Sequence, residues 1–248
     1  MSHEVVQLAD RTQRNSDCPL KNCPFRSHCL QHTTEIGWRP RFSLLRRNQV
    51  VCEQGQPSDA TFVVRSGSVK CVYDSADGHE QIVDFRFPGD TVEAAAAIGQ
   101  VCSSTVIALE SSSVCAIPRM SVDNDSSHDL FRILMAESGR QLHERNSHAL
   151  VIGQRTARQR LAWLLVKIAD KYAERGFSGV RFNLPMSRHD IANHLALAIE
   201  TVSRLLSDLA REGLVEVHGR MIEILDTDGL RDAASLEKGA QSKAAATH

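Results

Sequence analysis

The sequence predicts an α+β chain in which an all-β region is followed by a long helix and a winged helix-turn-helix. Three observations support this prediction. Glycines recur every ten to twelve residues from position 55 to position 99, and β-rich runs lie between them. A single helical pattern covers residues 127–152. Residues 187–224 have the apolar spacing of two short helices followed by a strand, a turn and a strand.

The all-β region spans residues 41–118, and strands at this regular spacing indicate a sandwich or a roll. The β-rich runs end at Pro118, which is unfavourable in a continuing strand. We expect strands within residues 60–64, 68–73, 81–85, 105–109 and 113–117. The first 40 residues are polar and rich in turn formers, and they show no sustained periodicity.

The long helical pattern has a loose apolar seam, which consists of Leu130, Leu134, Leu142, Ala149 and Ile152. Polar residues interrupt this seam between 139 and 148. Two interpretations stay open: a weakly self-associating dimer helix, or a solvated connector that packs on the roll of its own chain. A second helix over 155–175 opens the C-terminal domain.

The helix-turn-helix begins at Ser187, a favourable N-cap, and Asp190 three residues later completes a capping-box pattern. The second helix is expected to bury Val202, Leu205, Leu206 and Leu209. Gly213 ends that helix, and the segments 214–217 and 221–224 are the two strands of a wing.

Three polar residues of the second helix, Glu200, Ser203 and Arg204, share one outward face because they stand at positions i, i+3 and i+4. Glu accepts a hydrogen bond from cytosine N4, and Arg binds guanine O6 and N7. We therefore expect this face to read double-stranded DNA. The alternative is an ordinary helical hairpin without a DNA role.

Composition limits the class of protein. The 248 residues carry a net charge of −1, but residues 155–222 hold eleven Lys or Arg against seven Asp or Glu, which fits contact with phosphates. No run of about 18 apolar residues predicts a membrane span. No secretory signal is visible, so we expect a cytoplasmic protein. His143 and His148 are five residues apart and cannot share one metal on a helix face, and no catalytic motif is found, so no enzyme is expected.

Seven cysteines in a cytoplasmic chain favour thiolate chemistry over disulfides. Cys52, Cys71 and Cys102 stand in or beside strands, where we expect small apolar core residues. The other thiols, Cys18, Cys23, Cys29 and Cys115, are candidate metal ligands. From the residues alone, the first three could bind zinc with Cys115, or with His28 or His32 in its place, or the thiols could be redox-active without a metal.

The glycine-punctuated roll, the long helix and the wing together resemble the CRP/FNR family of bacterial transcription regulators over almost the whole chain. Family-like stretches are residues 62–70, 87–90, 160–162, 175–178 and 200–204. The resemblance implies a cysteine-containing N-terminal arm over 1–40, a cyclic-nucleotide-binding-like β-roll sensor domain over 41–120 and a dimerisation helix over 121–152. A winged helix-turn-helix over 153–230 and a disordered tail over 231–248 follow.

In function, the resemblance implies a homodimer that binds palindromes with TTGAT-like half-sites. Glu200, Ser203 and Arg204 match the DNA-reading trio of the FNR branch. Contact with RNA polymerase is implied by the family. The turn 77–80 is a candidate surface for it, and the alternative is that this turn is a plain hairpin tip.

The signal is the remaining question. Cyclic-AMP-binding members carry an Arg-Ser pair in the roll, whereas residues 99–105 contain no arginine, so cyclic-AMP control is not expected. The FNR branch holds an oxygen-labile [4Fe–4S] cluster on four cysteines. Cys23, Cys29 and Cys115 match three of them, whereas the first family position falls on Leu20. We expect Cys18 to replace it; sensing by zinc, by thiol redox chemistry, by another small ligand or by a cyclic nucleotide are the alternatives.

Overall fold

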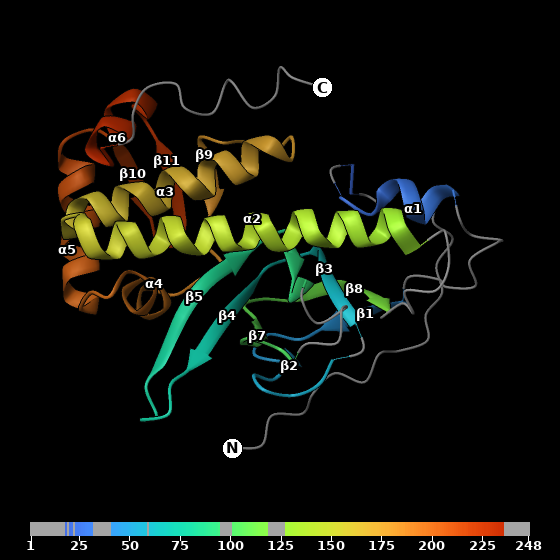
Figure 1. Cartoon of the computed structure of the whole chain (residues 1–248). Helices are drawn as coiled ribbons and strands as arrows, with labels where there is room; N and C mark the ends of the chain where they lie inside the picture. The colour runs from blue at the N-terminus through green and yellow to red at the C-terminus, as the bar shows by residue number, and fades with distance from the viewer. Residues whose placement is uncertain are drawn as a thin grey trace. The chain divides into compact units, whose positions relative to one another are not determined.

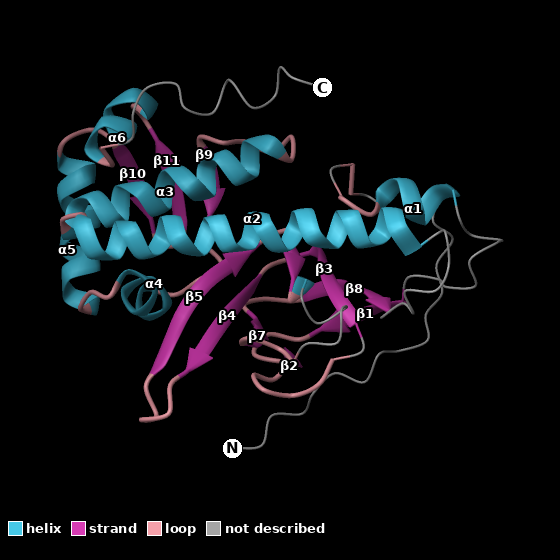
Figure 2. Ribbon diagram, viewed as in Figure 1, coloured by secondary structure: helices cyan, strands magenta, loops and turns pink. Residues whose placement is uncertain are grey.

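The computed structural model describes residues 18, 20–21, 23–31, 41–58, 60–94, 101–118 and 127–235. The chain forms two compact units, Met1–His148 and Ala149–His248. Figure 1 shows the chain with its elements labelled, and Figure 2 shows the same view by secondary structure.

The first unit contains two antiparallel four-stranded sheets. One sheet has the order β1 (Arg41–Leu45), β8 (Ser112–Pro118), β3 (Ala60–Ser66) and β6 (Thr91–Val92). The other has the order β2 (Val50–Cys52), β7 (Thr105–Ala108), β4 (Val69–Asp74) and β5 (Glu80–Arg86). These strands confirm the predicted all-β region and add β1, β2 and β6 to the five predicted runs.

The core of the roll is built from small and β-branched side chains of both sheets, such as Val64, Val69 and Val106. Cys52, Cys71 and Cys102 belong to this core, which confirms the prediction that they are buried as small apolar residues. Gly67 turns the chain from β3 into β4 at φ +72°. A Cβ at this position would lie 2.8 Å from the backbone of Ser112, so a larger residue does not fit.

Two helices accompany the roll, α1 (Arg26–Gln31) and α2 (Ser127–Gln154). Leu130 and Leu134 of α2 are buried against Phe25, Val63 and Ile117 of the same unit. Of the two interpretations of the apolar seam, packing on the roll of the same chain therefore applies to these two residues.

The apolar side chains that α2 leaves exposed are Phe131, Met135, Leu142 and Leu150. Phe131, Met135 and Leu142 follow one another at helical spacing and so form one stripe along the helix. We refer to these three residues as the exposed stripe. It lies on a different side of α2 from Leu130 and Leu134.

The second unit contains α3 (Ala157–Glu174), β9 (Arg181–Asn183), α4 (Arg188–Leu195), α5 (Ile199–Arg211), β10 (Val215–His218), β11 (Met221–Ile224) and α6 (Thr227–Ala233). The sheet order is β10-β11-β9, so β9 adds a third strand to the two that the sequence predicted. Phe182 of β9 pairs with Ile222 of β11 and is buried.

The predicted tail over 231–248 begins too early, because α6 continues to Ala233. Asp226 caps this helix by accepting a hydrogen bond from the Gly229 amide, and Leu230 is fully buried. The rest of that tail, from residue 236, and most of the predicted arm over 1–40 lie outside the described residues. Among the helices that the structure describes, none is long and apolar enough to cross a membrane.

Candidate functional site

The helix-turn-helix is held by the local interactions that its sequence predicts. The Ser187 hydroxyl accepts a hydrogen bond from the Asp190 amide at 3.1 Å, and the Asp190 carboxylate accepts one from the Ser187 amide at 2.9 Å. Helix α4 ends at Ala196, which adopts the left-handed conformation with φ 51°. This residue turns the chain directly into α5.

Helix α5 separates a buried face from a polar one. Val202, Leu206 and Leu209 are buried as predicted, whereas Leu205 is only partly buried. Glu200, Ser203 and Arg204 are exposed, and they lie within the first turns of the helix. Within the part of the chain that the structure describes, the side chains of Glu200 and Arg204 form no hydrogen bond or ion pair, so both are available to an outside partner.

The wing is attached to the start of α4 by polar contacts. Arg188 donates a hydrogen bond to the Gly219 carbonyl at 3.0 Å, and Arg220 donates one to the Pro185 carbonyl at 3.2 Å. The Leu184 amide also donates to the Arg220 carbonyl at 2.8 Å. These contacts fix the wing tip beside the N-terminus of α4.

The four candidate ligand thiols come from two distant segments of the chain, and the fold brings them together. Cys18, Cys23 and Cys29 come from the segment around α1, and Cys115 lies in β8. Cys23 interacts electrostatically with each of the other three thiols. Arg26 fixes the first segment, because its Nη1 donates to the Leu20 carbonyl at 2.7 Å and the Cys18 carbonyl at 3.3 Å.

The thiols lie in a poorly solvated environment. Burial raises the pKa of Cys23 and of Cys29 to about 12, and that of Cys115 to about 11, and electrostatic repulsion from neighbouring thiols adds to each increase. Two contacts act in the opposite direction. The Phe25 amide donates a hydrogen bond to Cys23 and lowers its pKa, and the positive charge of Arg65 lowers the pKa of Cys115. Thiolates at this site therefore need a compensating cation.

This thiol cluster is part of the surface on which α2 packs. Cys23, Cys29 and Cys115 pack against the apolar group that contains Leu130 and Leu134. Figure 1 shows α1 beside the first turns of α2. A change in the positions of the thiols therefore acts directly on the start of α2.

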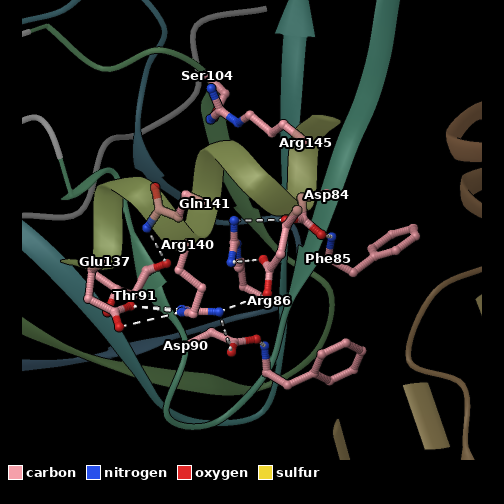
Figure 3. Close-up of polar contacts among 12 residues, drawn as sticks. Asp84, Phe85, Arg86, Asp90, Thr91, Ser104, Glu137, Arg140, Gln141 and Arg145 are labelled. Carbon is pink, nitrogen blue, oxygen red and sulfur yellow. Dashed lines mark hydrogen bonds and ion pairs between the residues drawn. The ribbon is translucent and has the colours of Figure 1, made fainter. Parts of the chain in front are cut away.

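A buried ion-pair network, which the sequence did not suggest, joins β5 to the middle of α2 (Figure 3). Arg86 is 2% exposed; its Nη2 lies 2.7 Å from Asp84 Oδ2, and its Nη1 lies 2.7 Å from Glu144 Oε2. Burial alone would lower the pKa of Arg86, but Asp84 and Glu144 raise it above its ordinary value. The guanidinium is therefore charged inside the first unit.

Arg140 extends the network along α2. It binds Glu144 Oε1 at 2.8 Å and Glu137 Oε2 at 2.7 Å, and its Nη1 lies 3.9 Å from Asp90 Oδ1. One helical turn of polar residues thus contacts the roll, as Figure 3 shows. The polar stretch that interrupts the apolar seam therefore also packs on the roll of its own unit.

The buried carboxylate of Glu93 accepts hydrogen bonds from the residues directly before β7. Glu93 accepts hydrogen bonds from the Ser103 amide at 2.7 Å and from the Ser104 hydroxyl at 2.6 Å. Arg145 of α2 donates to the Ser103 hydroxyl at 3.0 Å. An anionic ligand would have to compete with a negative charge that already holds these donors.

Comparison with known proteins agrees with both units. Residues 43–124 match the cyclic nucleotide-binding domain model, and residues 159–233 match the Crp-like helix-turn-helix domain model. The chain is 33% identical over 229 residues to the transcriptional activator protein FnrA of Stutzerimonas stutzeri, which covers 89% of this chain and 93% of FnrA. It is 35% identical over 185 residues to the transcriptional activator protein Anr of Pseudomonas aeruginosa, over 74% of this chain and 76% of Anr.

A solved structure shows the same architecture. FixK2 of Bradyrhizobium japonicum matches with a TM-score of 0.71 at 27% sequence identity, over 82% of this chain and 100% of the FixK2 chain. The matched relatives are transcription regulators and not enzymes, which agrees with the expectation from the sequence. With its β-roll, its winged helix-turn-helix and this identity, the chain belongs to the CRP/FNR family of DNA-binding transcription regulators.

Proposed function

We propose that this regulator is a cytoplasmic FNR-type homodimer that controls genes in response to oxygen. In this proposal Cys18, Cys23, Cys29 and Cys115 hold a [4Fe–4S] cluster, and Glu200, Ser203 and Arg204 read TTGAT-like palindromes. The observation that carries the proposal is the convergence of four thiols from two distant segments beside the first turns of α2. Relatives named as anaerobic regulatory proteins support the same signal.

We propose a cluster rather than a single zinc ion, because four thiolates are the ligand set of a [4Fe–4S] cluster. Among the described residues, no three His, Cys, Asp or Glu side chains are close enough to hold one metal ion together; His32 and the side chain of His28 lie outside that set. Zinc needs its sulfur ligands at about 2.3 Å from one centre. A four-iron cluster is larger and takes one thiolate at each iron, so its four cysteines lie further apart. Cys18 supplies the fourth thiol, since Leu20 has none.

When bound, the cluster supplies a centre that oxygen can destroy, together with the positive charge that the thiolates require. The residues of the chain transmit the change. With their thiolates fixed, Cys23, Cys29 and Cys115 keep the apolar group around Leu130 and Leu134 closed. Without that constraint, the first turns of α2 lose part of their packing surface.

The partner that we propose for the exposed stripe of α2 is a second copy of the chain. Phe131, Met135 and Leu142 are 44%, 38% and 60% exposed, although they are large and apolar. The opposite polar side of the helix is occupied by its own roll through Arg140 and Glu144. Two-fold pairing along the stripe would place two helix-turn-helix units on successive half-sites of a palindrome.

For the signal, Glu93 argues against a cyclic nucleotide. Its carboxylate holds the Ser103 amide and the Ser104 hydroxyl, which a cyclic phosphate would need as donors. For the output, we infer contact with RNA polymerase from the family, with the exposed turn 77–80 as the candidate surface.

The test is anaerobic purification, followed by measurement of iron, acid-labile sulfide, the visible spectrum and the oligomeric state before and after exposure to air. We expect about four irons and four sulfides per chain, bleaching in air, and a shift from dimer to monomer. Cys18→Ala should lose the iron, whereas Cys71→Ala, a matched control in the core of the roll, should keep it. Zinc, no metal, or a dimer that survives air unchanged would contradict the proposal.

A further inference from the structure

Two of the cysteines outside the proposed cluster site lie next to each other in the roll. Cys52 is the last residue of β2, and Cys102 lies just before β7. The turn between Cys52 and Pro57 holds Cys102 in place, because the Gly55 amide donates to the Cys102 carbonyl at 2.8 Å and the Cys102 amide donates to the Gln56 carbonyl at 2.9 Å. Both cysteines are buried.

Both side chains belong to the same core cluster of the roll. The two thiols interact with each other, and this interaction raises the pKa of Cys52 and lowers that of Cys102. Cys71 differs from this pair, because burial raises the pKa of its thiol to about 12.

We propose that Cys52 and Cys102 form a disulfide when the roll meets a small hydroperoxide, so that the roll contains an oxidation site separate from the thiols at Cys18, Cys23, Cys29 and Cys115. The proposal rests on the interaction between the two thiols and on the backbone hydrogen bonds that fix Cys102. To bond, the sulfurs must approach to about 2.05 Å. Neither thiol belongs to the proposed cluster site, so the proposal does not depend on the cluster.

The reaction balances with hydrogen peroxide as the oxidant. The Cys102 thiolate attacks one peroxide oxygen, the O–O bond breaks, and Cys102 becomes a sulfenic acid as hydroxide leaves and takes up a proton. The Cys52 sulfur then attacks the Cys102 sulfur, the S–O bond breaks, and water leaves. Overall, two thiols lose two electrons and two protons, and one peroxide becomes two waters.

The surroundings favour a small oxidant. Cys102 is 1% exposed, but its neighbour Val101 is 50% exposed and Ser103 is exposed. The sulfur therefore lies just beneath the surface, and a short local opening admits a peroxide more readily than a bulky disulfide. We expect hydrogen peroxide to oxidise the pair much faster than oxidised glutathione does.

The test treats two folded proteins with hydrogen peroxide: the natural chain, and a variant in which Cys18, Cys23, Cys29 and Cys115 are replaced by Ser. Peptide mass spectrometry without reductant should find Cys52 linked to Cys102 in both, with the loss of two hydrogen masses. Cys71→Ser should leave the link unchanged, whereas Cys102→Ser should abolish it.

Three results would overturn the proposal. One is a folded natural chain in which Cys52 and Cys102 both stay alkylatable after peroxide treatment. Another is a link that forms only in urea, and the third is a link that includes Cys71 as often as Cys102. A failure of the variant to fold does not block the test, because the natural chain gives the same readout. Failure to bind iron tests the proposed function alone.

Discussion

Replacement of Arg86 by Met should remove the buried cation that joins β5 to α2. Met keeps the unbranched apolar stem of the side chain but leaves Asp84 without its ion pair. Arg86 is 2% exposed and its two ion pairs measure 2.7 Å each. Removal of one partner of a buried pair costs about 3–5 kcal/mol. This is a large part of the 5–15 kcal/mol that typically stabilises a domain.

The assay should resolve the first unit, because a two-unit chain does not give a single unfolding free energy. Hydrogen exchange of peptides from β5 and from the first part of α2 reports that unit. In a Trp38→Phe background, fluorescence of Trp163, which lies in α3, reports the second unit, because the chain has only these two tryptophans. We expect Arg86→Met to speed exchange in the first set strongly and to leave the Trp163 transition unchanged.

Two further variants isolate the cause. Arg132→Met on the same helix removes a surface pair with Asp129, measured at 3.9 Å between exposed side chains, and should cost less than about 1 kcal/mol. Adding Asp84→Leu to Arg86→Met should recover most of the loss, since Glu144 stays paired with Arg140. The reasoning is refuted if Arg86→Met behaves like Arg132→Met, or if the double variant is less stable than the single one.

Three other predictions concern DNA binding, self-association and folding. Glu200→Ala or Arg204→Ala should each weaken binding to a TTGAT palindrome by about 1–3 kcal/mol and leave salt-sensitive binding to a scrambled site, as measured by fluorescence anisotropy; equal loss on both sequences would contradict the reading role. Leu142→Glu should convert the anaerobic dimer into a folded monomer in sedimentation experiments. An unchanged dimer would show that the exposed stripe is not the dimer interface. Ser187→Ala should lower the free energy of unfolding of the second unit by about 0.5–2 kcal/mol in urea, because the hydroxyl accepts a hydrogen bond from the Asp190 amide. No change would show that this cap is dispensable.

Local patterns made the second unit predictable. Ser187 and Asp190 form the capping box that their spacing indicates, and Val202, Leu206 and Leu209 are buried at the helical spacing. Strand β9 escaped prediction because it has three residues and gains its stability from pairing with β11, far away in the sequence. Short strands of this kind have no pattern of their own for an apolar count to detect.

The apolar seam of α2 shows a different limit. Periodicity finds the apolar residues of a helix but does not say whether the chain itself or another chain covers them. Leu130 and Leu134 are covered by the thiol segment and the roll, whereas Leu142 stays exposed. Exposure had to come from the structure before Phe131 and Met135 could be assigned to the stripe.

The ion-pair network was missed for a related reason. Asp84 and Arg86 stand two residues apart in a strand, so they point to one face, and a charged face of a strand ordinarily meets solvent. Here α2 covers that face and supplies Glu144 as a second anion for Arg86. The sequence did show two opposite charges at alternate positions of β5. It did not show that Glu144 of α2 lies beside them, because this contact forms only in the folded chain.

The first part of α2 is thus held to its own unit at two places with different chemistry. Near Leu130 and Leu134 the contact is apolar and includes Cys23, Cys29 and Cys115, whereas one to three turns later it consists of the ion pairs of Arg86 and Arg140. Loss of order among the thiols weakens the first contact and leaves the second intact, since the carboxylates and guanidinium groups do not change charge. On the proposed mechanism, air should therefore speed hydrogen exchange in the first turns of α2 and leave the segment around Glu144 protected. Equal loss along the whole first part of α2 would mean that the helix leaves the roll as one body, and the ion pairs would then not limit the motion.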